Sequence, residues 1–441
     1  MLKRILLLTQ LMLLPSFAAW SDLHAQDKKP SQALRQLAEQ QRKLSEELQR
    51  EVEQLMERSS ESGSSASAPA FAPDLDEADK MDEALIKFAA ERAAGFRINE
   101  WKGVELYALG ALYQLAEQFA PAGEAFRAYL KGDSGSRAAA NARTGLIRAL
   151  IQTEQLAEAE KLLVGAEWII TDNPAVLAAR AGLYKDLAIA LRDRGLSEKA
   201  AELAKKGYTL AELISDSRRI GMATQEAARR NQVTLAALAV ASYERTGRKK
   251  EAGDLNKLVM DFDFNRQPEL RAVYESELAA ARLIGTPAPE LDVSRWIEGK
   301  HGAPKSLAEL RGKVVLLDFW AMWCGPCVAA FPRLRQFQSK YAQAGFEILG
   351  VTKLYGRSDT EESLAREQEF KSLQNYKARH QLAYPFAVGK MDDVANEERY
   401  GVAGIPTVIL IDRRGVVRHV KRGIGEYRKL EKQIVKLIGE K

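Results

Sequence analysis

Residues 314–327, VVLLDFWAMWCGPC, decide the fold of the C-terminal part of this 441-residue chain. The stretch opens with a run of apolar residues over 314–317, which is typical of a buried β-strand. It ends with Cys324 and Cys327, at the start of a helix expected over 325–343. Two cysteines separated by two residues, between a strand and a helix, indicate a redox-active dithiol.

The placement of the two cysteines suggests how they would react. At the start of a helix, unpaired amide N–H groups and the helix dipole favour an anion, so we expect a lowered pKa for the Cys324 thiol. Cys327 lies one turn further on, close enough to attack a mixed disulfide and release a substrate. Pro326 suits the first helical turn, where its missing N–H would be unpaired anyway. A purely structural disulfide is an alternative, although so short a loop would contribute little stability.

Working outward from this stretch, strands and helices alternate. We expect strands over 346–351, 384–388, 407–411 and 416–420, and helices over 363–381, 392–400 and 426–438. Before them, the GTPAP segment at 285–289 interrupts a long helical pattern. The alternation predicts an α/β domain over residues 284–441.

Together these motifs resemble the secreted thioredoxin-like proteins of the TlpA/ResA (redoxin) family. Besides the dithiol stretch, GIPT at 404–407 is similar to the thioredoxin cis-proline loop. GTPAPELDV at 285–293 and LAELRGK at 307–313 resemble the segments that lead into the family's fold. The resemblance implies a thioredoxin fold and thiol–disulfide oxidoreductase activity without a cofactor, and it does not extend to the N-terminal helices.

The resemblance also implies roles for particular residues. Cys324 would be the attacking thiol and Cys327 the resolving thiol. Asp318 matches a buried acid that moves the proton of the resolving cysteine, and burial should raise its pKa. Ala330 departs from the family, which often has glutamate at that position. The expected substrate-binding residues are Trp323, Gly325, Pro326, Ile405 and Pro406, with a cis bond before Pro406.

The region before residue 284 has a different character. Residues 74–283 show helical apolar spacing, with small residues at close-packing positions. Repeated features are Leu109, Gly110, Tyr113, Ala122 and Phe126, then Gly145 and Ala157, then Gly195 and Ala200, then Tyr243, Gly247 and Ala252. We therefore expect a tetratricopeptide-like helical domain that docks a protein partner, with a generic helical domain as the alternative.

The N-terminal segment has the pattern of a secretory signal. Lys3 and Arg4 precede an apolar run over 5–14 and small residues up to Ala25, so we predict a signal peptide over residues 1–25. The apolar run is too short to span a membrane. The mature protein is therefore expected in the periplasm or another extracytoplasmic space. Residues 26–58 are expected to form an amphipathic helix or short coiled coil, and residues 59–73 a flexible linker.

Composition narrows the possible partners. The 65 Lys and Arg residues against 60 Asp and Glu leave a net charge of +5, too little to predict nucleic-acid binding. Two cysteines and four histidines provide no structural zinc site, so no metal is expected. A basic stretch over 413–422 is expected to be a solvated hairpin, with a membrane or acidic partner as the alternative. We expect the protein to be a reductase of protein disulfides that is itself reduced by a membrane thiol donor. A disulfide oxidase or isomerase and a helical-repeat adaptor remain alternatives.

Overall fold

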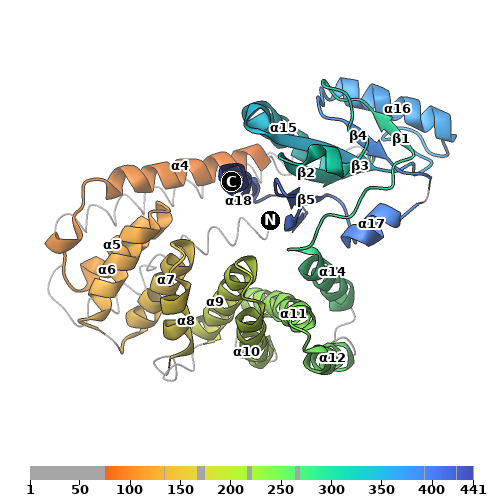
Figure 1. Cartoon of the computed structure of the whole chain (residues 1–441). Coiled ribbons are helices and arrows are strands. Elements are labelled where there is room, and N and C mark those ends of the chain that lie inside the picture. Colours follow the sequence, from red (N-terminus) through yellow and green to blue (C-terminus); the bar gives the residue numbers. More distant parts are fainter. Residues whose placement is uncertain are drawn as a thin grey trace.

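The computed structural model describes residues 75–440, except 134, 166–173, 216–220, 264–268, 392 and 424. The predicted signal peptide, coiled coil and linker therefore lie outside the described residues. Within the described part, a succession of helices ends at Leu283 and is followed by an α/β unit (Figure 1). The predicted fold class, a helical region followed by a thioredoxin fold, is confirmed. Among the described residues, no helix has the length and apolar character needed to cross a membrane.

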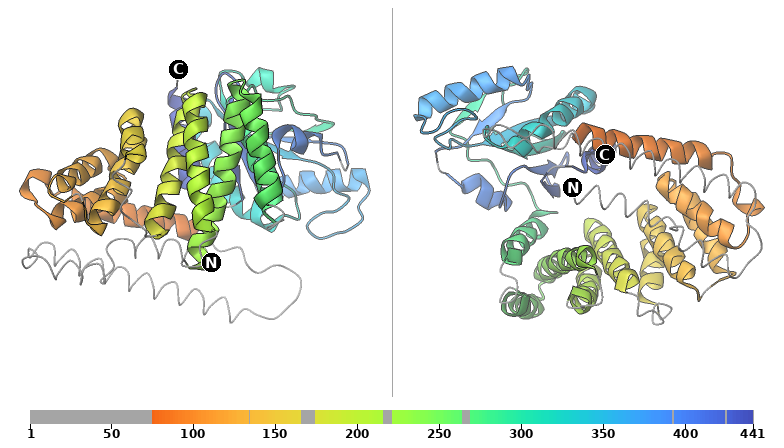
Figure 2. Two further views of the ribbon diagram at one scale, coloured as in Figure 1. Left: turned by 90° about the horizontal axis from the view of Figure 1, so that it is seen from below. Right: turned by 180° about the vertical axis from the view of Figure 1, so that it is seen from behind.

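The helical region is an arc of helices packed against their neighbours, as Figures 1 and 2 show. Small residues set the close spacing: a Cβ atom at Gly110 would lie 2.8 Å from the Phe126 ring, and one at Gly145 would lie 2.5 Å from it. Phe126 thus fills the space that the two glycines leave. The helices are α4 (Leu75–Ala93), α5 (Val104–Leu115), α6 (Phe119–Leu130), α7 (Arg137–Gln152), α8 (Leu156–Val164), α9 (Pro174–Asp193), α10 (Ser197–Ser215), α11 (Met222–Arg245), α12 (Lys249–Leu258) and α14 (Glu269–Leu283).

Four helix pairs in this arc are joined by the same kind of turn. Each turn has one residue with positive φ: Glu117 at 57°, Glu154 at 63°, and Gly195 and Gly247 at 77°. In each turn, the N–H group of the following residue donates to the carbonyl five residues before it, at 2.8–2.9 Å, which closes the preceding helix with a Schellman-type cap. The turn geometry therefore repeats along the arc.

A buried alanine follows each of these turns at the same distance. The alanines are Ala122, Ala159, Ala200 and Ala252, all at most 3% exposed. The predicted position of the second alanine, Ala157, is wrong, because Ala157 is exposed and Ala159 takes the buried position. Within a helix, a shift of two residues moves a side chain to another face.

The α/β unit is built on one six-stranded sheet with the order β1-β4-β3-β2-β5-β6. Strand β2 lies inside it, parallel to β3 and antiparallel to β5. Alternate β2 residues pack into cores on opposite faces, which explains its continuous apolar sequence. The strands are β1 (Arg295–Ile297), β2 (Val314–Phe319), β3 (Phe346–Thr352), β4 (Phe386–Val388), β5 (Thr407–Ile411) and β6 (Val417–Arg422). The helices are α15 (Gly325–Tyr341), α16 (Arg366–Arg379), α17 (Ala395–Tyr400) and α18 (Tyr427–Gly439).

The α/β unit contacts the arc at both of its ends (Figure 1). Helix α4 touches α15, and α14 touches α17. After α14, the chain runs beside β6, where the Gly285 N–H donates to the Val417 carbonyl at 2.7 Å and the Val417 N–H donates to Thr286 at 2.9 Å. The arc and the α/β unit are therefore joined by the chain itself and by packing away from it.

The basic stretch predicted to be a solvated hairpin instead packs against the helical region through strand β6. Arg422 donates to Glu277 of α14 at 2.9 Å, and Arg418 lies between Asp412 at 3.1 Å and Glu440 at 2.7 Å. Burial lowers the pKa of His419 to about 4. The solvated-hairpin prediction was wrong because the sequence does not show that the helical region covers this edge of the sheet.

Candidate dithiol active site

The two cysteines meet at the amino end of α15. Cys324 is the N-cap residue, and its sulfur accepts a hydrogen bond from the Cys327 N–H at 3.2 Å. The cysteines form a disulfide whose Cα atoms are 5.2 Å apart. Cys324 is 4% and Cys327 1% exposed. After reduction, the Cys324 sulfur lies where helix N–H groups and the helix dipole stabilise a thiolate.

Asp318 is a buried acid in the strand that leads to the dithiol. It is 1% exposed, and its Oδ2 atom has no hydrogen-bond partner among the described residues. Burial raises the pKa of Asp318 to about 7, and the positive charge of Lys421 partly opposes this rise. Lys421 is placed to do so because Asp318 pairs with Val408 on β5, and Val408 pairs with Lys421 on β6. The carboxyl group can therefore exchange a proton near neutral pH.

The proline loop lies beside the end of β2. The Ile405–Pro406 peptide is cis. Thr407, the first residue of β5, pairs with Phe319, the last residue of β2, from which the dithiol loop departs. Ile405 contacts both cores and remains partly exposed. Strand pairing thus brings the Ile405–Pro406 segment to the edge of the sheet where the dithiol lies.

The two tryptophans near the dithiol have different environments. Trp320 is 1% exposed and packs against Phe331 and Tyr376 at ring distances of 5.3 and 5.6 Å, so it belongs to the core. Trp323 is 38% exposed, and its indole lies perpendicular to the Tyr355 ring, with the ring centres 5.3 Å apart. Arg357 lies over the Trp323 ring at 4.1 Å. Trp323 therefore presents an aromatic surface directly before Cys324.

Two residues at Trp323 that were not predicted from sequence, Tyr355 and Arg357, come from the loop between β3 and α16. Glu369, 1% exposed on α16, holds this loop by accepting the Tyr355 and Gly356 N–H groups at 2.8 Å each. No motif marks these residues. The only signal is a glutamate in the first turn of a helix, and its burial depends on tertiary packing.

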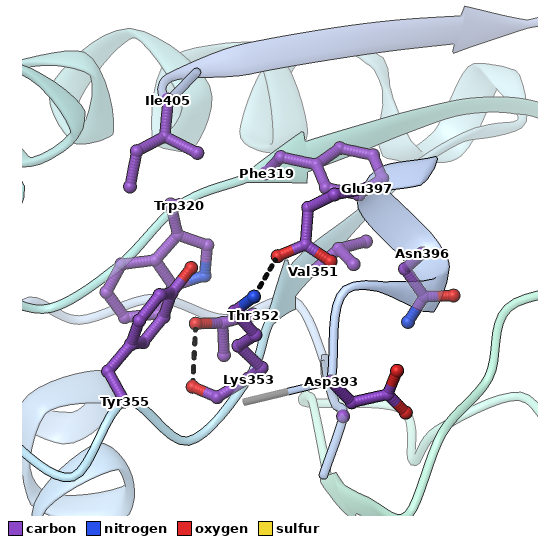
Figure 3. A pocket seen from close by; sticks show the side chains of 11 residues that line it. Phe319, Trp320, Val351, Thr352, Lys353, Tyr355, Asp393, Asn396, Glu397 and Ile405 are labelled. Atoms are coloured by element: carbon purple, nitrogen blue, oxygen red, sulfur yellow. Dashed lines mark hydrogen bonds and ion pairs between the residues drawn. The ribbon is translucent and has the colours of Figure 1, made fainter. Parts of the chain in front are cut away.

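A small polar pocket adjoins the proline loop (Figure 3). Ile405 and Trp320 lie on one side of it, and Lys353 and Glu397 form an ion pair of 3.0 Å on the other. The side chains of this pair are only 12% and 21% exposed. Tyr355 also lines the pocket, with the Lys353 ammonium group 5.3 Å from its ring centre. The pocket provides charged and aromatic groups next to the residue that precedes the cis-proline.

A dithiol at a helix amino terminus, after a strand with a buried acid and beside a cis-proline, defines the class of thioredoxin-like redox proteins. The Redoxin family model matches residues 283–434. Several relatives are named thiol-disulfide oxidoreductase ResA. The relative from Geobacillus thermodenitrificans (strain NG80-2) is 31% identical over 140 residues, covering 32% of this chain and 70% of the relative. The relative from Bacillus thuringiensis subsp. konkukian (strain 97-27) is 30% identical over 154 residues, covering 35% and 78%.

Solved structures include similar chains. The thioredoxin domain of a thiol-disulfide oxidoreductase from Bacteroides vulgatus is 27% identical, with a TM-score of 0.27, and the match covers 34% of this chain and 97% of that one. The chain belongs to the redoxin family of thiol-disulfide oxidoreductases. The family match begins at residue 283 and therefore does not cover the helical arc.

Proposed function

We propose that the protein reduces disulfide bonds of protein substrates outside the cytoplasm. The observation that carries this proposal is the Cys324–Cys327 pair at the amino end of α15, after a strand that contains the buried acid Asp318. The Cys324 thiolate attacks a substrate disulfide, forms a mixed disulfide and expels one substrate thiolate. The Cys327 thiolate then attacks the Cys324 sulfur, which releases the second substrate thiolate. The substrate gains two electrons and the protein becomes the Cys324–Cys327 disulfide.

Asp318 is the proposed proton acceptor for the resolving step. Cys327 is 1% exposed, so bulk water has little access to its thiol. A carboxyl group with a pKa of about 7 can take up a proton at neutral pH and lose it again. The pKa of Asp318 supports this role because it lies near the operating pH.

The proposed substrate-binding surface surrounds the buried sulfur of Cys324. Trp323, Gly325 and Pro326 are exposed around it and leave room for an extended substrate segment. The cis Ile405–Pro406 peptide, at the same edge of the sheet, would offer backbone groups to that segment.

The direction of electron flow is part of the proposal. The Gly325-Pro326 pair between the cysteines and the buried acid resemble thioredoxin, which is a reductant near −270 mV, whereas a strong oxidant lies near −120 mV. A disulfide oxidase or isomerase is the second candidate. Equilibration of the mature protein with glutathione and dithiothreitol buffers, read by thiol alkylation, separates them. A potential near the thioredoxin value supports the reductase, and one near the oxidant value refutes it.

A reductase in this setting needs a source of electrons and a way to find its partners. We propose a signal peptide over residues 1–25, export to the periplasm and re-reduction by a membrane thiol donor. We also propose that residues 74–283 are a tetratricopeptide-like domain that docks a protein partner, and that residues 284–441 are the thioredoxin-like domain. The four equivalent turns of the arc support the repeat assignment.

A non-enzymatic adaptor is the remaining candidate, and a Cys324→Ser variant tests it. If the variant binds its partner but no longer reduces it, the enzyme proposal stands. If both partner binding and the cellular phenotype survive the substitution, the dithiol is secondary and the adaptor proposal replaces it.

A further inference from the structure

Helix α18 turns a basic face toward the helical arc. Arg428, Lys432 and Lys436 are spaced four residues apart and therefore share one face of the helix. Arg428 binds the Glu117 carboxylate at 2.5 Å, and Lys432 pairs with the same oxygen. The Lys436 ammonium group lies 3.4 Å from the Glu154 carboxylate. A row of cations on the α/β unit is thus matched by two carboxylates of the arc.

The two glutamates occupy unusual backbone positions. Of the four equivalent turns, two have glycine at the positive-φ residue, Gly195 and Gly247, and two have glutamate, Glu117 and Glu154. A residue with a Cβ atom is strained in this conformation, whereas glycine is not. Glycine would therefore form the same turn at a lower free energy. Both glutamates pair with the basic face of α18, and Glu154 is also bound, more closely, by Arg194 of the arc itself.

The contact depends on charge. Glu117 and Arg428 are the most buried of these side chains, 29% and 24% exposed, and Glu117 also receives Lys432. Glu154 and Lys436 are 52% and 55% exposed, so their pair is weak alone. Exposed ion pairs are screened by salt. The contact should therefore loosen as the ionic strength rises, with Glu117 contributing more than Glu154.

The contact with α18 lies away from the segment that links the arc to the α/β unit. The chain passes from the arc to the α/β unit after α14, where Arg422 and Glu277 also pair. Glu117, in the turn between α5 and α6, lies toward the other end of the arc, and Glu154, in the turn between α7 and α8, lies nearer its middle; both meet α18. Release of α18 would leave the α/β unit held by the linking segment, by the α4–α15 contact and by the edge strand β6, where Arg422 pairs with Glu277.

We infer that Glu117 and Glu154 form a salt-sensitive latch that holds α18 on the arc and fixes the direction in which the dithiol faces. The inference goes beyond the proposed function because it holds whichever way electrons flow. It gives a reason for the strained glutamate at 117, where glycine forms the same turn elsewhere, whereas Glu154 is held by Arg194 of the arc as well as by Lys436.

The test measures the distance between the arc and the α/β unit in the full chain. Spin labels are attached at the exposed positions Lys131→Cys on the arc and Lys371→Cys on α16, in a chain that also carries Cys324→Ser and Cys327→Ser. Distance distributions are recorded by pulsed electron resonance in about 0.02 M and about 0.5 M salt, where the Debye length falls from about 20 Å to about 4 Å. We expect a narrow distribution at low salt and a broad one at high salt.

Variants separate the latch from a role in the turn alone. Replacing both glutamates with glutamine should broaden the low-salt distribution without raising the Tm of the helical region. Replacing both with glycine should broaden it equally and raise that Tm by roughly 2–4 °C per site, because the strained conformation is relieved.

Two further variants complete the test. The matched control is Lys429→Glu, since among the described residues Lys429 pairs with Glu426 of its own α/β unit, at 3.2 Å, and is 77% exposed. It should leave the distribution narrow. Combining Glu117→Lys with Arg428→Glu and Lys432→Glu should restore a narrow distribution. The latch is overturned if the glutamine and glycine variants keep the parental distribution at low salt, or if Lys429→Glu broadens it to the same extent.

Discussion

The strongest prediction concerns Asp318→Asn, which removes the buried titratable group and keeps its shape. Raising the pKa of Asp318 from 3.8 to about 7 corresponds to about 4 kcal/mol, since one pKa unit is worth about 1.4 kcal/mol. This acid binds its proton more tightly in the folded state than in the unfolded state. Its contribution to stability is therefore complete below pH 3.8, is lost as the pH rises toward 7, and stays lost above that.

The variant should consequently gain stability relative to the parent as the pH rises. Asparagine does not titrate, so it avoids the loss of about 4 kcal/mol above pH 7. The asparagine amide is buried without a partner, which costs about 1–3 kcal/mol and reduces the gain in stability by that amount. We expect the oxidised variant to be about 1–3 kcal/mol more stable than the parent at pH 8 and less stable than the parent at pH 4. Urea unfolding of both oxidised proteins at the two pH values measures this.

The same variant should slow the resolving step. Loss of a positioned proton acceptor typically costs 10²–10⁴-fold, so we expect release of substrate from the Cys324 mixed disulfide to fall by at least about 10²-fold at pH 7. The inflection near pH 7 in the parental rate should also disappear. Stopped-flow measurements of release from a preformed mixed disulfide provide the test. An unchanged pH profile together with an unchanged difference in stability between pH 4 and pH 8 would refute the assignment of Asp318.

Three other predictions follow from single contacts. Lys421→Met removes a positive charge that opposes the raised pKa of Asp318, so the inflection in the resolving rate should move to higher pH. Lys421→Arg keeps the charge and should leave the inflection at its parental pH. If neither change affects the pH profile, the placement of Lys421 opposite Asp318 through strand pairing does not influence the acid. Cys327→Ser should trap the mixed disulfide on the attacking cysteine, visible as a reductant-sensitive adduct in mass spectra, and free turnover in its place would count against the resolving role. Gly145→Ala should destabilise the helical region by about 1–3 kcal/mol, because the new Cβ would lie 2.5 Å from the Phe126 ring. In the same urea titration, Gly253→Ala serves as the control, since a Cβ there meets no atom within 4 Å.

Much of the α/β unit could be predicted from sequence because its signals are local. The apolar run of β2 is buried on both faces, and the positions of Cys324 and Pro326 at a helix start follow from adjacent residues. Strand β1 was not predicted, because its three residues form a strand only by pairing with β4. The second repeat was misplaced by two residues, because helical spacing alone accepted Ala157 as readily as Ala159.

The local pattern of residues by itself determined the chemistry of this protein: a strand, a dithiol and a helix that follows at once. Tertiary structure alone decided the surroundings of that chemistry. The pKa of Asp318 depends on burial and on a lysine two strands away, and the loop with Arg357 is held against Trp323 by a buried glutamate. The physical reason is that strand and helix formation depend on neighbouring residues. Burial, charge pairing and contact between distant segments arise only when the whole chain packs.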